Sequence, residues 1–178
     1  MVGQTSVSKE LTWVLIAAVV LYLLFVNSTG SVELLTDRTD EERKVIADKV
    51  KKSSWYGTLV RVAVDYNIPP KRIAAIVAVE SAGNPNALGT SGEQGLMQLM
   101  TPAVKDVYSQ WKQSYTVALV TGLNLFDPKT NLTIGTCYLA ILKNRTGSLD
   151  QATQDYNDGS LDRGYAYLNE VLSFEKFF

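Results

Sequence analysis

The longest apolar stretch of the chain lies near its N-terminus. Residues 11–32 carry no charged side chain, and residues 11–26 are almost entirely Leu, Val, Ala and aromatic residues. A helix rises about 1.5 Å per residue, so this stretch would span roughly 33 Å, which is enough to cross a bilayer. Trp13 and Tyr22 stand near the ends of the apolar part, as interfacial aromatic residues often do. We therefore expect one N-terminal transmembrane helix and a single-pass membrane protein.

A cleaved signal peptide is the alternative interpretation of this segment. Residues 26–28, Val-Asn-Ser, could serve as a small-residue processing site after a short apolar core. The leading region is long, however, carries only Lys9 as a basic residue and has no Ala-x-Ala motif, which favours an uncleaved anchor. Basic and acidic residues are mixed after residue 37, so the positive-inside rule does not set the orientation of the anchor.

Helical patterns and turn signals alternate along the rest of the chain. Thr39 and Glu42 fit a capping box that opens a charged helix ending near residue 52. A second helical pattern covers residues 55–66, and the prolines at 69–70 suit the start of a third helix. Further helices are predicted at residues 102–113, 132–143, 149–156 and 165–174, and one stretch, 116–120, resembles a strand. The predicted fold class is mainly α, with residues 1–32 as anchor, 33–52 as linker and charged helix, and 53–178 as one domain.

Glu80 is an acid at the end of an apolar helix. Residues 73–79 are all Ile, Ala or Val. Glu80 shares a helical stripe with the apolar residues seven, four and three positions before it, which are Ile73, Ile76 and Val77. Burial disfavours a charged carboxylate and raises its pKa, and a protonated acid near neutral pH suits general-acid cleavage of a glycosidic bond. Glu80 is therefore the leading candidate for a catalytic residue.

The composition excludes several other kinds of site. The chain has no His and a single cysteine, Cys137, so zinc sites built from Cys and His and nucleophiles activated by His are excluded. Cys137 lies in an apolar run and is interpreted as a small core residue. The 17 Lys and Arg nearly balance the 18 Asp and Glu, which leaves no basic surface for nucleic acid. We expect no metal and no cofactor.

Four short motifs in fixed order resemble one family. They are Glu80-Ser81, the Gly-Leu-Met-Gln segment at 95–98, the Asn-x-x-x-Gly-x-x-Tyr-Leu pattern at 131–139, and Tyr156-Asn157. This series resembles the lysozyme-like lytic transglycosylases, which are related to goose-type lysozymes, over residues 67–159. One difference is Asp155, which stands before Tyr156 where the family commonly has Ala. If the Asp155 side chain pointed toward Glu80 its charge would raise the Glu80 pKa further, whereas the simpler expectation is that it faces water.

The resemblance implies a lysozyme-like helical domain that cleaves the β-1,4 bond between N-acetylmuramic acid and N-acetylglucosamine in peptidoglycan. Glu80 would be the single acid and base, and the sugar's own 6-hydroxyl would close a 1,6-anhydro ring. Ser81, Met97, Gln98, Tyr156 and Asn157 are the implied substrate-binding residues. From the residues alone, the alternatives are that Ser81 finishes a helix, that the Met97 and Tyr156 side chains belong to the core, and that Asn157 forms a turn.

The implied partner is the glycan strand of peptidoglycan, reached from a membrane anchored through residues 11–32. The catalytic domain would face the periplasm or the cell wall, or project from a virion membrane, within a secretion or virion membrane complex. A small anchored enzyme suits local wall penetration, by a phage entering a cell or by a secretion machine, more than bulk wall turnover. Two alternatives stay open: a hydrolytic goose-type-like lysozyme, and a noncatalytic wall-binding membrane protein.

Overall fold

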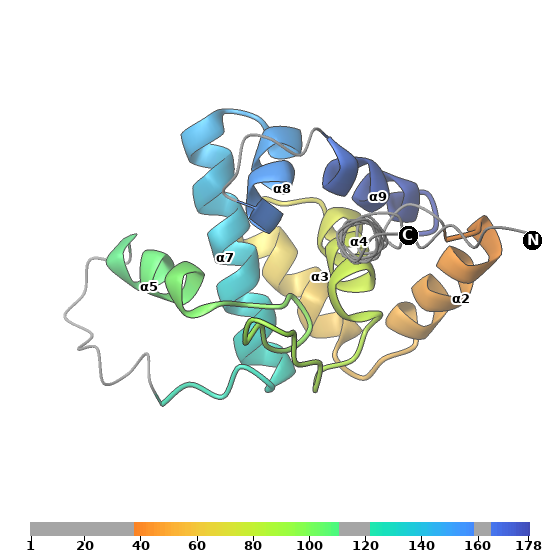
Figure 1. Cartoon of the computed structure of the whole chain (residues 1–178), viewed down its shortest axis with the longest axis horizontal. Coiled ribbons are helices and arrows are strands. Elements are labelled where there is room, and N and C mark those ends of the chain that lie inside the picture. The colour runs from red at the N-terminus through yellow and green to blue at the C-terminus, as the bar shows by residue number, and fades with distance from the viewer. Residues whose placement is uncertain (1–37, 111–121, 159–164) are drawn as a thin grey trace, which may run out of the picture. The chain divides into compact units, whose positions relative to one another are not determined.

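The computed structural model describes residues 38–110, 122–158 and 165–178. These residues form helices α2 (Asp40–Lys51), α3 (Tyr56–Asp65), α4 (Pro70–Ser81), α5 (Thr101–Gln110), α7 (Pro128–Thr146), α8 (Leu149–Asp158) and α9 (Ala166–Glu175) (Figure 1). Two isolated antiparallel bridges, Leu88 with Gln94 and Gln94 with Leu99, are the extended pairing in this part of the chain. The mainly α fold class is therefore confirmed. None of the described helices is long and apolar enough to span a membrane.

The predicted anchor at residues 11–32 and the predicted strand at residues 116–120 lie outside the described residues.

The capping box at the start of α2 is present, because Thr39 N–H donates to Glu42 Oε2 over 2.8 Å and Glu42 N–H donates to Thr39 Oγ1 over 3.3 Å. Helix α7 begins four residues before its predicted start at 132. The side chain of Asp127 caps its first turn by accepting from the Thr130 N–H, and Pro128 follows in the first helical position.

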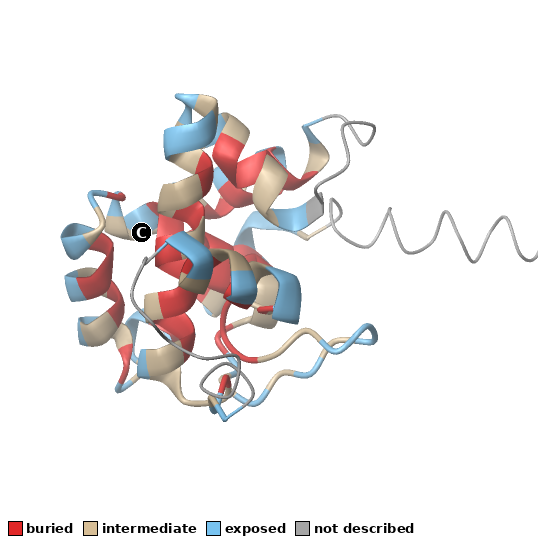
Figure 2. Ribbon diagram, turned by 90° about the vertical axis from the view of Figure 1, so that its left-hand side faces the viewer, coloured by how far each residue is buried: buried red, intermediate tan, exposed pale blue. Residues whose placement is uncertain are grey.

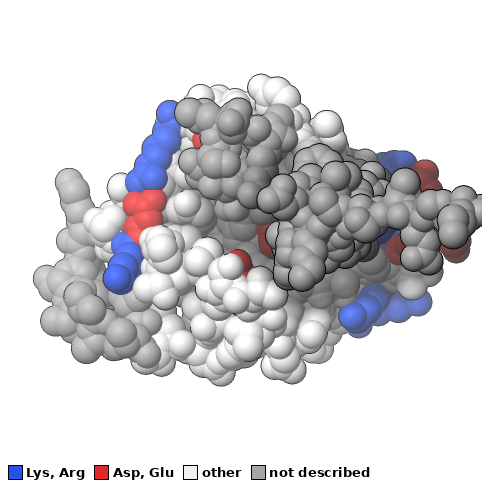
Figure 3. Space-filling view, in the orientation of Figure 1, with Lys and Arg blue, Asp and Glu red and all other residues white. Residues whose placement is uncertain are grey.

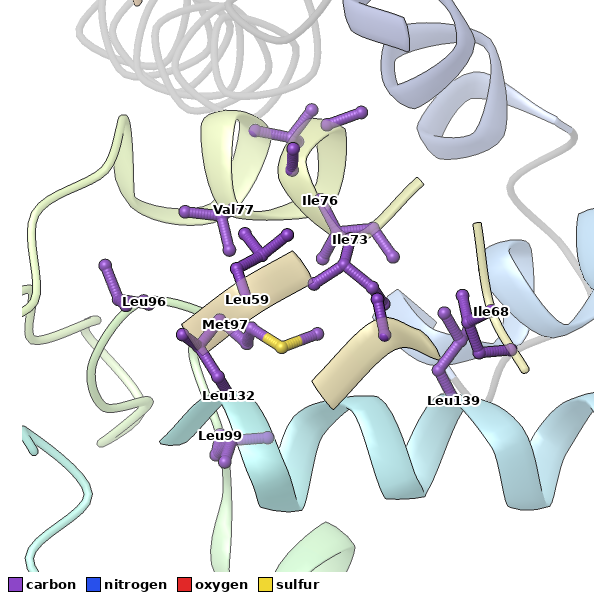
Figure 4. Close-up of a cluster of buried hydrophobic side chains, with 14 of the residues drawn as sticks. Leu59, Ile68, Ile73, Ile76, Val77, Leu96, Met97, Leu99, Leu132 and Leu139 are labelled. Atoms are coloured by element: carbon purple, nitrogen blue, oxygen red, sulfur yellow. The ribbon is translucent and has the colours of Figure 1, made fainter. Parts of the chain in front are cut away.

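Helix α4 packs on several other helices and forms the centre of the core. It contacts α2, α3 and α9, while α7 contacts α3, α5 and α8. Figure 2 shows the buried residues on the inward faces of the helices and the exposed residues outside. Figure 4 shows side chains of α3, α4, α7 and the loop before α5 meeting in one cluster, with Ile73, Ile76 and Val77 of α4 among them. All residues from 72 to 79 are buried, so α4 runs through the core, and the partly buried Glu80 follows in its last turn.

Ion pairs hold α9 against α2. The buried Arg43 of α2 donates to Glu170 Oε2 over 2.8 Å and lies over the Phe174 ring, 5.9 Å from its centre. At the end of the same interface, Lys176 pairs with Asp40 at 2.8 Å. Removing one partner of a buried charge pair leaves an uncompensated charge, so such a pair resists separation of its helices. These contacts fix the position of α9 relative to the helices it packs on.

A second buried arginine joins α4, α8 and α9. Arg72, 5% exposed, donates to Thr153 Oγ1 over 2.7 Å, to Asp150 Oδ1 over 2.8 Å, and to Glu175. Its guanidinium satisfies groups on three helices at once, as a planar five-donor group allows. The beginning of α4 and the end of α9 are thereby fixed relative to each other.

Candidate active site

Glu80 occupies the last turn of α4 and is partly buried. Its Oε1 accepts a 2.6 Å hydrogen bond from the hydroxyl of Tyr167 on α9. Burial raises the pKa of Glu80 from an ordinary value of 4.5 to about 7, the negative charge of Glu93 raises it as well, and the Tyr167 hydrogen bond opposes them by stabilising the ionised form. The carboxyl group therefore exchanges its proton close to neutral pH, as a group that must act first as an acid and then as a base requires.

Tyr167 was not among the predicted site residues. This residue is 5% exposed and shares the buried face of α9 with Val171 and Phe174, four and seven residues later. A hydroxyl on such a face needs a partner inside the protein. That requirement is the signal that could have drawn attention to Tyr167, but only the packing of α9 on α4 shows that the partner is Glu80.

Glu93 was also missed as a neighbour of Glu80. Asp155 was a candidate for the acid that raises the Glu80 pKa, but the charge that does so belongs to Glu93, in the loop between α4 and α5. Asp155 instead accepts a 2.7 Å hydrogen bond from Gln151, one turn earlier on α8. The loop bends back beside the end of α4. This path was not predictable from the spacing of Glu80 and Glu93 in the sequence.

The buried side chain of Asn131 fastens that loop to α7. Asn131 Oδ1 accepts from the Met97 N–H, and its Nδ2 donates to the carbonyl oxygens of Gln94 and Leu125, all over 2.8 Å. Asn131 is 0% exposed, so these bonds replace water completely. These contacts give Asn131 a structural role, which is to hold the loop against α7.

Two motif glycines permit the close approach of the loop to α7. A Cβ on Gly95, which has a φ of +77°, would lie 2.3 Å from the Leu125 carbonyl oxygen and 2.4 Å from Asn131 Nδ2. A Cβ on Gly135 of α7 would lie 2.5 Å from the sulfur of Met97. A side chain at either position would push the loop away from α7.

Met97 requires a correction as a substrate-binding residue. Its side chain is 0% exposed and fills the core beside Gly135, among Leu59 and Leu132 in Figure 4. Because Gly135 has no side chain, the thioether of Met97 fits into the core beside α7. An enclosed thioether has no surface for a ligand to contact. The backbone of Met97 still serves the site, since its carbonyl oxygen accepts a 2.9 Å hydrogen bond from the Tyr156 hydroxyl.

Ser81 joins the end of α4 to the same loop. Its hydroxyl lies 2.8 Å from the Leu96 carbonyl oxygen and 3.1 Å from the Val77 carbonyl oxygen, both of which accept. The hydroxyl proton is thus directed at the protein, and the oxygen lone pairs are what Ser81 can offer a ligand. Ser81 therefore holds the end of α4 against the loop that precedes α5.

The amide of Gln98 is oriented by the loop itself. Its Nε2 donates to the carbonyl oxygens of Gly95, over 2.9 Å, and Ala87, over 3.2 Å. Its Oε1 points to Gly89, where an added Cβ would be 2.9 Å away. Both amide hydrogens are engaged, so Gln98 can offer a ligand an acceptor but not a donor.

Tyr156 and Asn157 lie in the last turn of α8. The Tyr156 ring is 5.6 Å from that of Tyr138, and burial together with the charge of Glu80 raises the pKa of Tyr156 well above its ordinary value. Its phenol therefore stays protonated and can keep donating to the Met97 carbonyl oxygen. Asn157 is exposed. The structure brings Glu80, Ser81, Gln98 and Tyr156 to one place, since the last three hydrogen-bond to the backbone of residues 95–97.

The face shown in Figure 3 carries a few acidic atoms near its middle, among uncharged residues of the described chain, while basic side chains lie toward its sides. Among the described residues, no group of three His, Cys, Asp or Glu side chains could hold a metal ion. The chemistry these residues offer is proton transfer by one carboxyl group beside hydrogen-bonding side chains.

Comparison with known proteins adds a family and a fold. Residues 60–170 match the family model described as "Transglycosylase SLT domain". The endo-type membrane-bound lytic murein transglycosylases A of Salmonella paratyphi B and Salmonella typhimurium are each 36% identical over 93 residues, which cover 51% of this chain and 43% of the relative. The chain thus spans less than half the length of these curated relatives.

Solved structures of lytic transglycosylases also resemble this chain, at lower sequence identity. An inactive mutant of the lytic transglycosylase Slt from Pseudomonas aeruginosa is 24% identical with a TM-score of 0.58, covering 68% of this chain and 23% of that one. The 70 kDa soluble lytic transglycosylase from Escherichia coli is 19% identical with a TM-score of 0.59, covering 81% and 31%. At this identity the likeness concerns the fold.

Proposed function

The chain belongs to the transglycosylase SLT domain family, and from this membership we propose that it is a peptidoglycan lytic transglycosylase. It cleaves the β-1,4 bond between N-acetylmuramic acid and N-acetylglucosamine and leaves a 1,6-anhydromuramic product. The single observation that carries the proposal is the state of Glu80, a partly buried carboxyl group with a pKa of about 7 that is held by Tyr167.

In the first step Glu80 is the general acid. Its proton moves to the glycosidic oxygen while the bond from that oxygen to the muramic acid C1 breaks, and the N-acetylglucosamine side leaves as an alcohol. Positive charge that develops at C1 is supported by the substrate's own acetamido group. The ionised Glu80 that results is stabilised by the Tyr167 hydroxyl, which donates to Oε1.

In the second step Glu80 is the general base. It takes the proton of the muramic acid 6-hydroxyl, whose oxygen bonds to C1 and closes the anhydro ring. Glu80 returns to its protonated form, no water is consumed, and one carboxyl group serves both steps. Ser81, Gln98 and Tyr156 are the proposed substrate-binding residues around it, with Asn157 at the edge of the site, and Met97 contributes through its backbone carbonyl group.

The proposed location is a membrane facing the cell wall. Residues 11–32 are the proposed anchor, and the name of the Salmonella relatives, which describes them as membrane-bound, supports it. A tethered enzyme acts only within reach of its linker, which suits local wall penetration by a phage entering a cell or by a secretion or virion membrane complex. Membrane fractionation of the full chain and of a variant lacking residues 11–32 tests the anchor, since only the full chain should sediment with the membranes.

The activity is tested by wall clearing with a Glu80→Gln variant. Gln is nearly isosteric with protonated Glu but supplies no acidic proton, so clearing of purified peptidoglycan should stop. Sedimentation of the variant with the wall should persist, because binding does not require the proton. Undiminished clearing by Glu80→Gln would reject the catalytic role of Glu80.

A further inference from the structure

The loop between α4 and α5 folds the side chain of Glu93 back over its own turn. The Gly89 N–H donates to the Glu93 carbonyl oxygen over 2.8 Å, and the Gly92 N–H donates to the Gly89 carbonyl oxygen over 3.2 Å. Within this turn Glu93 Oε2 accepts from the Ser91 N–H over 2.9 Å. The carboxylate therefore lies over Gly89, where a Cβ would be 2.2 Å from Oε2.

A second acceptor oxygen lies at the same point. Gln98 Oε1 would be 2.9 Å from the same added Cβ on Gly89, so both oxygens crowd the face of one glycine. Gln98 cannot turn its donors toward Glu93, because Nε2 is held by the Gly95 and Ala87 carbonyl oxygens. The Ser91 N–H already donates to Glu93 Oε2, but a carboxylate oxygen and an amide oxygen each accept more than one hydrogen bond, so both groups keep the capacity to accept from a ligand. The arrangement therefore favours a ligand that supplies an N–H or O–H group.

This acceptor pair belongs to the surroundings of Glu80. Glu93 is close enough for its charge to raise the pKa of Glu80, and the Tyr167 phenol on α9 donates a hydrogen bond to the same acid. The Tyr156 phenol on α8 is close enough to Glu80 for the Glu80 charge to raise its pKa. Neither phenol carries charge near neutral pH, so among the described residues Glu93 is the negatively charged side chain that a ligand meets beside the acid.

We propose that Glu93 is a substrate-positioning residue, which together with Gln98 Oε1 accepts hydrogen bonds from amide N–H or hydroxyl donors of the glycan beside Glu80. The inference rests on the proposed function and adds a specificity determinant to it. The arrangement requires glycine at residue 89, because any side chain there would collide with Glu93 Oε2 and Gln98 Oε1. A merely structural role for Glu93 is the competing explanation, because its side chain also accepts from the Ser91 N–H within the turn. The backbone bonds of Gly89 and Gly92 close the same turn independently of that side chain.

The test measures binding of an N-acetylglucosamine hexamer by isothermal titration calorimetry in the full chain carrying Glu80→Gln, which binds without turnover. Adding Glu93→Ala should weaken binding about tenfold or more, the range for a hydrogen bond to a charged group. Adding Glu93→Gln, which keeps an acceptor oxygen at the same reach but no charge, should restore part of the affinity, because a neutral acceptor forms a weaker hydrogen bond. Unchanged affinity in the Glu93→Ala variant, or equal losses in both variants, would overturn the inference.

Two further readouts separate this role from loop stability and from failure of the proposed function. With Glu80 intact, Glu93→Gln should move the alkaline limb of the pH–activity profile to lower pH, because removal of the negative charge lowers the pKa of Glu80. An unmoved limb would place Glu93 away from Glu80 and overturn the inference. If the unmodified chain releases no anhydromuramic ends from purified peptidoglycan, the proposed function itself fails, and the inference with it.

Discussion

Replacing Tyr167 by Phe isolates the hydrogen bond that controls Glu80. The substitution removes the hydroxyl that lies 2.6 Å from Glu80 Oε1 and keeps the ring, which is buried on α9. A hydrogen bond to a charged group contributes about 1.5–3 kcal/mol, and one pKa unit corresponds to about 1.4 kcal/mol. Because Glu80 is partly exposed and solvent replaces some of the lost stabilisation, we expect a shift of about one unit.

The sign of this shift follows from which form the bond stabilises. The Tyr167 hydroxyl donates to the carboxylate, so it favours the ionised form and lowers the pKa; without it the pKa of Glu80 rises above about 7. Since the free enzyme must begin with Glu80 protonated, the alkaline limb of kcat/KM should move to higher pH. The maximal rate should fall, because the carboxylate formed by proton transfer is less stabilised and less well oriented.

The assay is the pH dependence of peptidoglycan clearing, from about pH 4 to pH 10, for the unmodified chain and the Tyr167→Phe variant. Tyr165→Phe is the matched control, because it makes the same chemical change at a residue that is 59% exposed. The control profile should coincide with that of the unmodified chain. An alkaline limb in Tyr167→Phe that stays in place, or that moves to lower pH, would refute this account of the Glu80 environment.

Three further substitutions test the scaffold and the buried acid. Asn131→Ala removes three buried hydrogen bonds and should lower the free energy of unfolding in urea by about 3 kcal/mol, whereas exposed Asn144→Ala should change little. Gly135→Ala meets a sulfur atom 2.5 Å away and should cost about 1–3 kcal/mol in the same assay, while Gly57→Ala, with open space around it, should be neutral or stabilising. Glu80→Gln should stabilise the chain by about 1–3 kcal/mol at pH 8 but not at pH 4. The pKa of Glu80 is higher in the folded than in the unfolded chain, so ionisation of Glu80 costs stability as the pH rises from about 4.5 through 7. Melting temperatures of the variant and the unmodified chain that are equal at both pH values would contradict this prediction.

Local patterns were sufficient to predict the described helices and the partly buried position of Glu80. The apolar run before Glu80 indicated a buried helix that ends near this acid, and the structure has that helix as α4. The start of α7 was predicted too late because its first turn is set by the Asp127 cap and Pro128 rather than by apolar periodicity.

The neighbours of Glu80 depended on tertiary packing. Tyr167 lies 87 residues further along the chain than Glu80, and no periodic signal joins them. Glu93 is closer in sequence, but its position follows from a turn with backbone bonds at Gly89 and Gly92. Met97 was assigned to the substrate by its place in a motif, whereas its side chain is set by the space that Gly135 leaves in the core. Motif order thus identified the right segments without saying which atoms of each segment face the site.

The central claim is that the Glu80 carboxyl group performs both proton transfers of a nonhydrolytic cleavage. Mass spectrometry of the muropeptides released from purified peptidoglycan by the unmodified chain tests this claim most directly, with Glu80→Gln digested in parallel. The account predicts anhydromuramic ends from the unmodified chain and no new ends from the variant. Reducing ends alone from the unmodified chain, or anhydro ends from Glu80→Gln, would contradict it.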